Sequence, residues 1–387
     1  MPDVSIATSH ERCFTITRSL ARWIGLYVLC ASVLTARADQ VDDLITARMR
    51  ERHINGLSLA IIQEGKILRA KGYGFTDKTG QVPVTPTTLF QAASISKSVT
   101  AFAALHLVQK GKLELDADVN MQLRTWKLPG KEFTKDKKVT LRGILSHSAG
   151  LTVSGFWGYA TNEPIPTLVS VLDGVKPANT DAIRVDIVPG SKWRYSGGGY
   201  TVMQQMIIDV TGKPFPEFMS ETVLKPLGMT NSTYEQPLPQ DMAASCAAGY
   251  YAGDKAVKGR WHVYPEMAAA GLWTTASDLA RFAIGVQQAL AGDSNLVLSQ
   301  SMTRQMLSVQ NPSLQDGDGL GLFLAGSEKT LQFQHTGRNA GFDAYMIAYA
   351  YVGSGAVILI NANDDTGATK DIAEIIAKKY AWKEFHY

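Results

Sequence analysis

The run TLFQAASISKSVTAFAALHLVQKGKL (residues 88–113) carries the strongest helical pattern in the chain. Apolar residues recur in it at helical spacing, and Gly111 stands where a helix commonly ends. Near the start of this predicted helix lies the sequence SISK, which places Ser94 and Lys97 one turn apart on the same face. A serine hydroxyl is a poor nucleophile until a neighbour takes its proton, and a partly buried lysine can be that neighbour. The run therefore predicts a helix that presents a nucleophile.

The backbone N–H of Ser94 would lie in the first turn of this helix, where unpaired donors and the helix dipole favour a developing oxyanion. The alternative is an exposed serine beside a solvated lysine. Small and apolar neighbours argue for burial: Ala92, Ala93, Val99, Ala101 and Phe102.

Strand patterns lie at both ends of the chain. Residues 56–75 read as two β-rich runs joined at Glu64-Gly65, a hairpin signal. Three more strand patterns follow one another near the C-terminus, at 331–337, 342–350 and 355–363, and residues 369–383 form an amphipathic helical pattern. We therefore expect an α+β fold with three layers (α/β/α), in which one antiparallel sheet is built from N- and C-terminal segments and flanked by helices.

The middle of the chain mixes helical patterns with Pro- and Gly-rich loops, as at Gly212-Lys-Pro214, which would break residues 201–228 into two short helices. We predict a sheet domain from residues 39–115 and 266–387 and an inserted, mostly helical region at 116–265. The groove between them is the natural place for a ligand.

The composition excludes several classes of protein. The 387 residues are 45% hydrophobic and 19% charged, with a net charge of +3 and no basic stripe of the kind that binds nucleic acid. The motifs GxSxG, HExxH, CxxC and GxxxxGK[ST] are all missing. We expect no nucleic-acid partner, no metal and no organic cofactor.

The N-terminus reads as a secretory signal peptide over residues 1–38. Arginines precede a short apolar run (23–34), and Ala36-Arg-Ala38 offers the small residues that signal peptidase needs. An N-terminal anchor helix is the alternative. Cleavage would remove two of the three cysteines and leave Cys246, which we expect to be an inert thiol. A periplasmic or secreted protein without a membrane span after cleavage is predicted.

Two further motifs follow the SISK sequence in order. Tyr195-Ser-Gly197 ends the run PGSKWRYSG, and His335-Thr-Gly337 lies on a predicted C-terminal strand. With these three motifs the chain resembles the serine hydrolase family of class C β-lactamases, DD-peptidases (penicillin-binding proteins), D-aminopeptidases and family VIII carboxylesterases. Flanking stretches fit the same resemblance: LRGILSHSAGL (141–151), AAAGLWTTASDLARF (268–282) and HTGRNAGF (335–342). It covers residues 41–381 and implies the β-lactamase/transpeptidase-like fold.

The resemblance also implies roles. Ser94 would be the acylated nucleophile, with Lys97 and Tyr195 handling its proton, Tyr195 either as phenolate or as a hydrogen-bonded relay. The backbone N–H groups of Ser94 and Arg338 would form the oxyanion hole. Substrate would be bound by His335, Thr336, Gly337 and Gly197. Thr336 and Arg338 would share one face of the strand, where they could receive a substrate carboxylate, unless Arg338 is a solvated loop residue.

Two departures from the family pattern bear on the substrate. His335 stands where many β-lactamases have lysine, and Gly197 stands where the family usually has an asparagine that bonds the substrate amide. His147, at the end of the leucine-rich segment, reads as structural. Phe156 and Trp157 could wall the site or belong to the core.

We expect an exported serine hydrolase that works through an acyl-enzyme. Its substrates would be D-amino-acid-containing peptides or amides, such as peptidoglycan fragments, or small esters. The alternatives are a class C-like β-lactamase and a non-catalytic penicillin- or cell-wall-binding protein.

Overall fold

The structure is a computed structural model that describes residues 40–130 and 132–386. The predicted signal peptide, with Cys13 and Cys30, lies outside the described residues. Across the described ranges, none of the helices combines the length and the apolar character needed to cross a bilayer.

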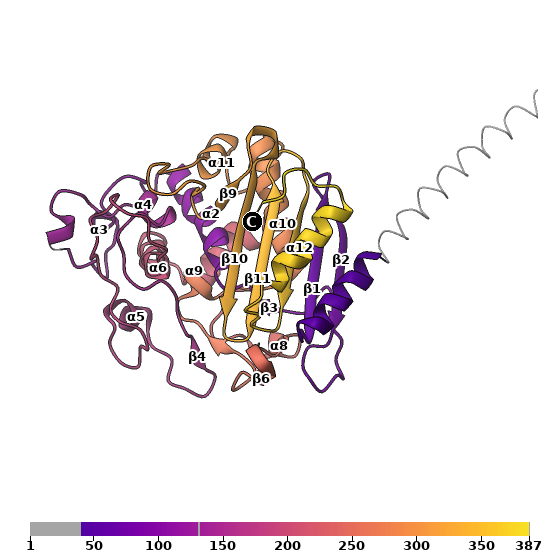
Figure 1. The fold of residues 1–387 in the computed structure, drawn as a ribbon. Helices are drawn as coiled ribbons and strands as arrows, with labels where there is room; N and C mark the ends of the chain where they lie inside the picture. Colours follow the sequence, from indigo (N-terminus) through magenta and orange to yellow (C-terminus); the bar gives the residue numbers. More distant parts are fainter. Residues whose placement is uncertain (1–39, 131, 387) are drawn as a thin grey trace, which may run out of the picture.

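A six-stranded antiparallel sheet forms the centre of the molecule, with strand order β2-β1-β12-β11-β10-β9 (Figure 1). Its strands are β1 (Gly56–Gln63), β2 (Lys66–Gly74), β9 (Phe323–Ala325), β10 (Gln332–Asn339), β11 (Phe342–Tyr349) and β12 (Gly355–Ile360). Strand β1 pairs with β12, so the two ends of the chain are joined inside one sheet. The predicted α+β fold with a sheet built from both ends is confirmed.

The predicted hairpin at Glu64-Gly65 is present as a two-residue turn between β1 and β2. Both residues have positive φ, 52° at Glu64 and 68° at Gly65. A two-residue turn with positive φ at both positions matches the right-handed twist of the strands. Glycine adopts positive φ without steric cost, which explains Gly65 in the second position.

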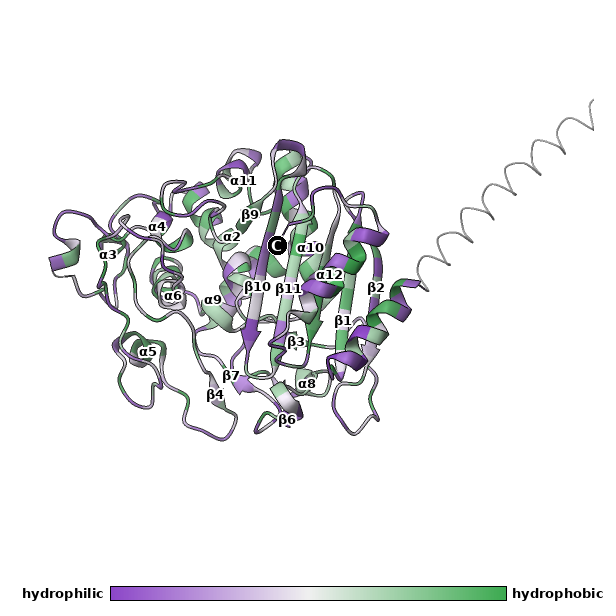
Figure 2. Cartoon of the chain, viewed as in Figure 1, coloured by the Kyte–Doolittle hydropathy of each residue, from purple (hydrophilic) through white to green (hydrophobic). Residues whose placement is uncertain are grey.

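Helices cover both faces of the sheet. On one face lie residues 40–51, helical in the described part of the chain, and α12 (Ala368–Lys379), which share an apolar cluster with β1 and β12. On the other face, α10 (Ala276–Ala291) and α2 (Ile95–Gln109) bury their side chains in the larger core. Figure 2 shows hydrophilic and hydrophobic bands alternating along α12, as expected of a helix with one face in water.

The helical run of residues 88–113 is shorter in the structure than its pattern suggests. It starts with β3 (Phe90–Gln91), which pairs with β8 (Trp273–Thr274), and α2 begins only after Ser94. Helix α2 ends as predicted at Gly111, whose φ is 65° and whose N–H donates to Val108 O, while Lys112 N–H donates to Leu107 O.

The region between the two sheet segments is rich in helices. Its longest helix is α6 (Gly197–Thr211), which ends at Gly212 (φ 67°) before Pro214 starts α7 (Phe215–Met219) and the π-helical turn η2 (Ser220–Leu224). The predicted break is confirmed, but α6 is longer than expected because it takes in the three glycines at 197–199. Short elements complete the chain: α3 (Val119–Gln122), η1 (Glu132–Thr134), α4 (Leu141–Leu145), β4 (Tyr159–Ala160), α5 (Leu168–Asp173), α8 (Gln240–Ala243), β5 (Tyr250–Tyr251), η3 (Ala252–Asp254), β6 (Lys255–Ala256), β7 (His262–Val263), α9 (Met267–Ala270), α11 (Gln300–Met306) and η4 (Glu328–Thr330).

Candidate active site

Ser94 and Lys97 meet at the N-terminus of α2, the position from which the helix dipole points at the site. Lys97 Nζ donates to Ser94 Oγ at 2.9 Å and to the backbone oxygen of Ala269 at 2.7 Å. The lysine side chain is almost completely buried, with a relative exposure of 2%. Burial without a carboxylate partner lowers the pKa of Lys97 to about 7, so a large fraction of this lysine is neutral near neutral pH.

Tyr195 brings a third polar group to the same point from the residue before the N-cap of α6. Its hydroxyl is hydrogen-bonded to the Ser94 side chain, and Lys97 Nζ lies 5.1 Å from the centre of its ring. Burial raises the pKa of Tyr195 well above its ordinary value, and the bond to Ser94 offsets only part of that shift. Of the two readings of Tyr195, the hydrogen-bonded relay fits this environment and the phenolate does not.

His335 lies on β10 and faces the same cluster. It is buried, and its Nδ1 lies 2.6 Å from the backbone oxygen of Thr336, which puts the ring proton on Nδ1 because a carbonyl only accepts. Burial is the main cause that lowers the pKa of His335 to about 3, and the charge of Lys97 is the second cause. His335 is therefore neutral at physiological pH and presents Nε2 as an acceptor.

Gly337 lies at a close contact between β10 and the start of α2. Its predicted role in substrate binding stays a prediction, and the structure shows the chain's own backbone where a side chain would stand. A Cβ atom at Gly337 would lie 2.2 Å from Ala92 O and 3.1 Å from Ser94 N. The glycine thus allows β10 to lie directly against the start of α2. Ala93, between these two contacts, has a φ of 49°, an unusual backbone for alanine.

The backbone N–H of Arg338 has the right direction for an oxyanion donor. Asn339 and Phe342 flank a two-residue turn and form the closing hydrogen-bonded pair. The next pair, Arg338 and Asp343, is then a non-hydrogen-bonded one, so the N–H of Arg338 points away from β11 and is not used by that strand.

The Arg338 side chain already has carboxylate partners within the protein. Its guanidinium is paired with Asp343 at 2.8 Å and with Asp365 at 2.6 Å, and it also donates to the Asp364 backbone. Thr336 is exposed on the same face of β10. Arg338 thus lies on a strand and not in a loop, and its side chain is 51% exposed while two carboxylates pair with the guanidinium.

Gly197 lies in the first turn of α6, where a Cβ atom would be 3.0 Å from the Phe156 ring and 3.0 Å from Ser154 O. The missing asparagine of the family pattern is therefore matched by an aromatic ring packed over the glycine. Phe156 is partly buried against the core, whereas the neighbouring Trp157 is 78% exposed. The two residues differ, and only Phe156 contacts the glycine.

Two buried titratable groups near these elements were not assigned a chemical role from the sequence. His147 packs its ring against that of Tyr195, with centroids 4.3 Å apart. Glu266, at the N-cap of α9, is fully buried and accepts no hydrogen bond from another residue described in the structure.

Cys246 is buried, which raises the pKa of its thiol to about 12, in keeping with an inert side chain. In the described ranges no three His, Cys, Asp or Glu residues gather as metal ligands.

A sequence profile described as Beta-lactamase matches residues 41–380. The chain belongs to the beta-lactamase family. This confirms the resemblance drawn from the three motifs and places the chain in a family of serine hydrolases.

Curated relatives in the family match part of the chain. Protein flp of Staphylococcus aureus (strain N315) is 29% identical over 206 residues, 51% of this chain and 38% of that protein. Esterase EstB of Burkholderia gladioli is 29% identical over 226 residues, 56% of this chain and 56% of that protein. The chain thus spans between about two fifths and little more than half the length of these relatives.

Solved structures share the fold over most of the chain. The octameric penicillin-binding protein homologue from Pyrococcus abyssi superposes with a TM-score of 0.72 at 23% identity, covering 89% of this chain and 77% of that one. A beta-lactamase/D-alanine carboxypeptidase from Yersinia pestis, complexed with citrate, gives 0.69 at 20% identity, covering 88% and 98%. At these identities the likeness establishes the fold alone.

Proposed function

We propose that this protein hydrolyses small carboxylic esters through an acyl-enzyme on Ser94. The observation that carries the proposal is the 2.9 Å contact between Ser94 Oγ and the buried Lys97 amine. Because burial lowers the pKa of Lys97 to about 7, a neutral amine is available to take the serine proton.

Acylation would use the three side chains together. As Ser94 Oγ attacks the ester carbonyl, its proton passes to Lys97, and Tyr195 donates a hydrogen bond within the same cluster. The oxygen of the tetrahedral intermediate would be stabilised by the N–H groups of Ser94 and Arg338. The proton held by Lys97 would then return through Tyr195 to the leaving alkoxide, which departs as an alcohol.

Deacylation would repeat these steps with water. Lys97, again neutral, would take a proton from a water molecule that attacks the acyl carbonyl, directly or through Tyr195. Collapse of the intermediate would release the acid and return the proton to Ser94.

The choice of esters rests on the charges around the site. A substrate that carries a carboxylate, such as a D-Ala-D-Ala peptide or a β-lactam, gains most from a fixed cation. His335 is neutral at physiological pH and the Arg338 guanidinium is already paired with Asp343 and Asp365, so neither offers one. Gly197 and Phe156 present no amide group to a peptide substrate. The likeness to esterase EstB points in the same direction.

The test is a substrate panel of p-nitrophenyl acetate, nitrocefin and an acyl-D-Ala-D-Ala peptide. We expect turnover of the acetate ester, with loss of all turnover in Ser94→Ala. Ser98→Ala is the matched control, since Ser98 lies one turn further along α2, is buried, and bonds only to Gly321 O. Retained turnover in Ser94→Ala would refute the proposal. Nitrocefin turnover above that of the ester would favour the β-lactamase alternative, and peptide cleavage a DD-peptidase.

A non-catalytic penicillin- or cell-wall-binding protein is tested by mass spectrometry. A fluorophosphonate should add covalently to Ser94, because neutral Lys97 can take the serine proton and make Ser94 nucleophilic. Absence of an adduct, together with saturable binding of cell-wall fragments, would favour the binding protein. We further propose that residues 1–38 direct export, which N-terminal sequencing of the mature protein would test.

A further inference from the structure

We propose that His147 is a positioning residue for Tyr195, and that it acts by accepting the N–H of Ser196 and packing against the phenol ring. The proposal rests on the proposed hydrolase function. His147 follows α4 and comes from a different part of the chain from the three motifs, so it joins the site only in the folded protein.

Among the ring neighbours of His147, which also include Trp193, Tyr200 and Phe323, Tyr195 has the shortest centroid distance. Its ring lies 4.3 Å from the Tyr195 ring, tilted by 36°, and its Nδ1 lies 3.2 Å from Ser196 N. Its backbone oxygen accepts the N–H of Arg194 at 2.8 Å. His147 therefore contacts the residue before Tyr195, the residue after it and the phenol ring itself.

These contacts fix the state of the imidazole. A backbone N–H only donates, so Nδ1 must be the acceptor and the ring proton is on Nε2. Burial, followed by the charge of Lys97 and the proximity of His335, lowers the pKa of His147 well below its ordinary value. The ring stays neutral, and it adds no positive charge beside a lysine that must lose its own.

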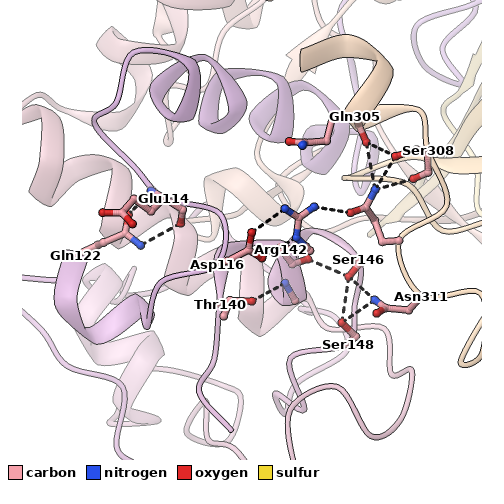
Figure 3. A network of polar contacts seen from close by, with 12 residues as sticks. Glu114, Asp116, Gln122, Thr140, Arg142, Ser146, Ser148, Gln305, Ser308 and Asn311 are labelled. Atoms are coloured by element: carbon pink, nitrogen blue, oxygen red, sulfur yellow. Dashed lines mark hydrogen bonds and ion pairs between the residues drawn. The ribbon is translucent and has the colours of Figure 1, made fainter. Parts of the chain in front are cut away.

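The backbone around His147 is held in place by a network of polar contacts (Figure 3). Arg142 on α4 forms a bidentate pair with Asp116, with both contacts between 2.7 and 2.8 Å. The side chains on either side of His147, Ser146 and Ser148, both accept hydrogen bonds from Asn311 Nδ2, at 3.2 and 3.1 Å. The two serines also contact each other at 3.0 Å.

The network matters because His147 has a φ of 56°, in the left-handed region. This backbone is uncommon outside glycine, although Asn, Asp and His adopt it more readily than most residues. Strain of this kind persists where the surroundings hold it, and it is concentrated at functional sites. The Figure 3 network holds Ser146 and Ser148 on either side of the turn, while Ser196 and Tyr195 contact the His147 side chain.

A purely structural role predicts a different response to mutation from a positioning role. If the buried ring only fills space, its replacement should lower the melting temperature, and activity should fall only as far as the protein unfolds. A ring that fixes Tyr195 against Ser94 would affect kcat with little change in KM, because misplacement of a proton-transfer group by a fraction of an ångström slows chemistry more than binding.

Two variants of the full chain separate these roles. His147→Asn keeps an acceptor close to the Nδ1 position and tolerates the left-handed backbone, while His147→Phe keeps a ring but removes the acceptor. For p-nitrophenyl acetate, we expect kcat to fall about 100-fold in His147→Phe and about tenfold in His147→Asn, with KM unchanged within about threefold. Thr140→Ala is the control, since it removes the N-cap bond of α4 to Gly143 N at 3.1 Å and none of the bonds made by residues 146–148. It should lower the melting temperature and keep kcat.

Wild-type kcat in a folded His147→Phe protein would overturn the proposal. The proposal would also be overturned if kcat fell equally in the two variants and in proportion to the loss of melting temperature. A readout without turnover keeps the inference separate from the proposed function: the ¹⁵N resonances of the histidine side chain in the resting protein, assigned through His147→Asn. An unprotonated Nδ1 at pH 7 supports the contact with Ser196 even if no ester is hydrolysed, and a protonated Nδ1 refutes it.

Discussion

At the scale of single residues, Lys97 and Tyr195 differ in their ability to accept a proton at neutral pH. Both are removed from water, and desolvation disfavours the charged form of each. For a lysine that form is the protonated one, so burial lowers its pKa, to about 7 here. For a tyrosine it is the phenolate, so burial raises the pKa of Tyr195. The same environment therefore produces a base from one residue and a hydrogen-bond donor from the other.

This difference predicts the pH dependence of ester hydrolysis. The active form has neutral Lys97, which is populated above its pKa, so kcat/KM should rise with pH and reach half of its plateau at about pH 7. His335 should add no inflection near neutrality because its pKa is lowered to about 3. A pH–rate profile for p-nitrophenyl acetate between pH 5 and 9 would measure the inflection.

Tyr195→Phe is the control variant for that profile. It should lower the plateau, because the relay is lost, but keep the inflection, because Lys97 remains. If the inflection disappears in Tyr195→Phe while the residual rate becomes independent of pH, Tyr195 is the titrating base and the assignment of Lys97 is wrong.

The sequence identifies these residues but not their protonation states. Ser94, Lys97 and Tyr195 follow from the order of motifs and from the apolar neighbours of the SISK sequence. Whether Tyr195 is a phenolate depends on burial, and burial depends on residues far away in the chain. Arg338 shows the same limit: its charge is obvious from sequence, but its pairing with Asp343 and Asp365 needs the β10–β11 hairpin and the chain beyond β12.

At the scale of elements, the site depends on how closely β10 approaches the start of α2. Gly337 provides that contact, with Ala92 O and Ser94 N on the other side. The N–H groups of Ser94 and Arg338 come from these two elements, so the spacing between the elements sets the spacing between the two proposed oxyanion donors.

Gly337→Ala should therefore damage catalysis more than stability. Its new Cβ would lie 2.2 Å from Ala92 O, a backbone atom that cannot rotate away, so β10 and α2 must separate. Overpacking of this kind typically costs about 1–3 kcal/mol of stability, whereas removing one oxyanion donor slows turnover about 100- to 1,000-fold. We expect a folded protein with kcat reduced by that order, as measured by thermal unfolding and steady-state kinetics.

Gly355→Ala is a comparison variant on β12, where the new Cβ would also meet backbone, Ile347 O at 2.8 Å. It should cost stability without a matching loss of kcat. Equal losses of kcat in the two variants would mean that the effect of Gly337→Ala comes from the sheet as a whole and not from the junction with α2.

The elements themselves were largely predictable, and the exceptions have physical causes. The hairpin at Glu64-Gly65 and the C-terminal strands have local signals that tertiary contacts reinforce. The start of α2 was placed too early because Phe90–Gln91 pairs with β8, a partner about 180 residues away. The start of α6 was missed because glycine is a poor helix former. Close packing explains the glycines there, since a Cβ atom would meet Phe156 and Ser154 O at Gly197 and Thr152 O at Gly198.

At the scale of the whole molecule, the predicted division has the polypeptide cross between the sheet domain and the helical region twice, with α9 just after the second predicted boundary. Helix α9 provides Ala269 O for Lys97 and is packed against both α2 and α6. Glu266 stands at its N-cap position, and its fully buried carboxyl group makes no capping hydrogen bond. Burial raises the pKa of Glu266 to about 8, so this carboxyl is mostly protonated in the folded protein at neutral pH.

The raised pKa of Glu266 makes the stability of the folded protein fall as pH rises. An unfolded glutamate releases its proton near its ordinary pKa of about 4.5, whereas the folded one keeps it until about pH 8. Between these values the folded state binds more protons than the unfolded state, so the contribution of Glu266 to the free energy of unfolding falls as pH rises. Below pH 4.5 the effect is absent, because both states are protonated.

Glu266→Gln should remove that slope, since the amide does not titrate. We expect the melting temperature of the variant, relative to that of the wild type, to rise between pH 5 and pH 8, whatever the offset caused by the amide itself at pH 5. Thermal unfolding at four pH values measures the difference.

Lys97 contributes in the opposite sense, because its lowered pKa makes stability rise with pH above about 7. The Lys97→Met variant should therefore be measured alongside. A difference between wild type and Glu266→Gln that stays constant from pH 5 to pH 8 would show that Glu266 is ionised in the folded protein, and that the crossing at α9 holds a buried charge.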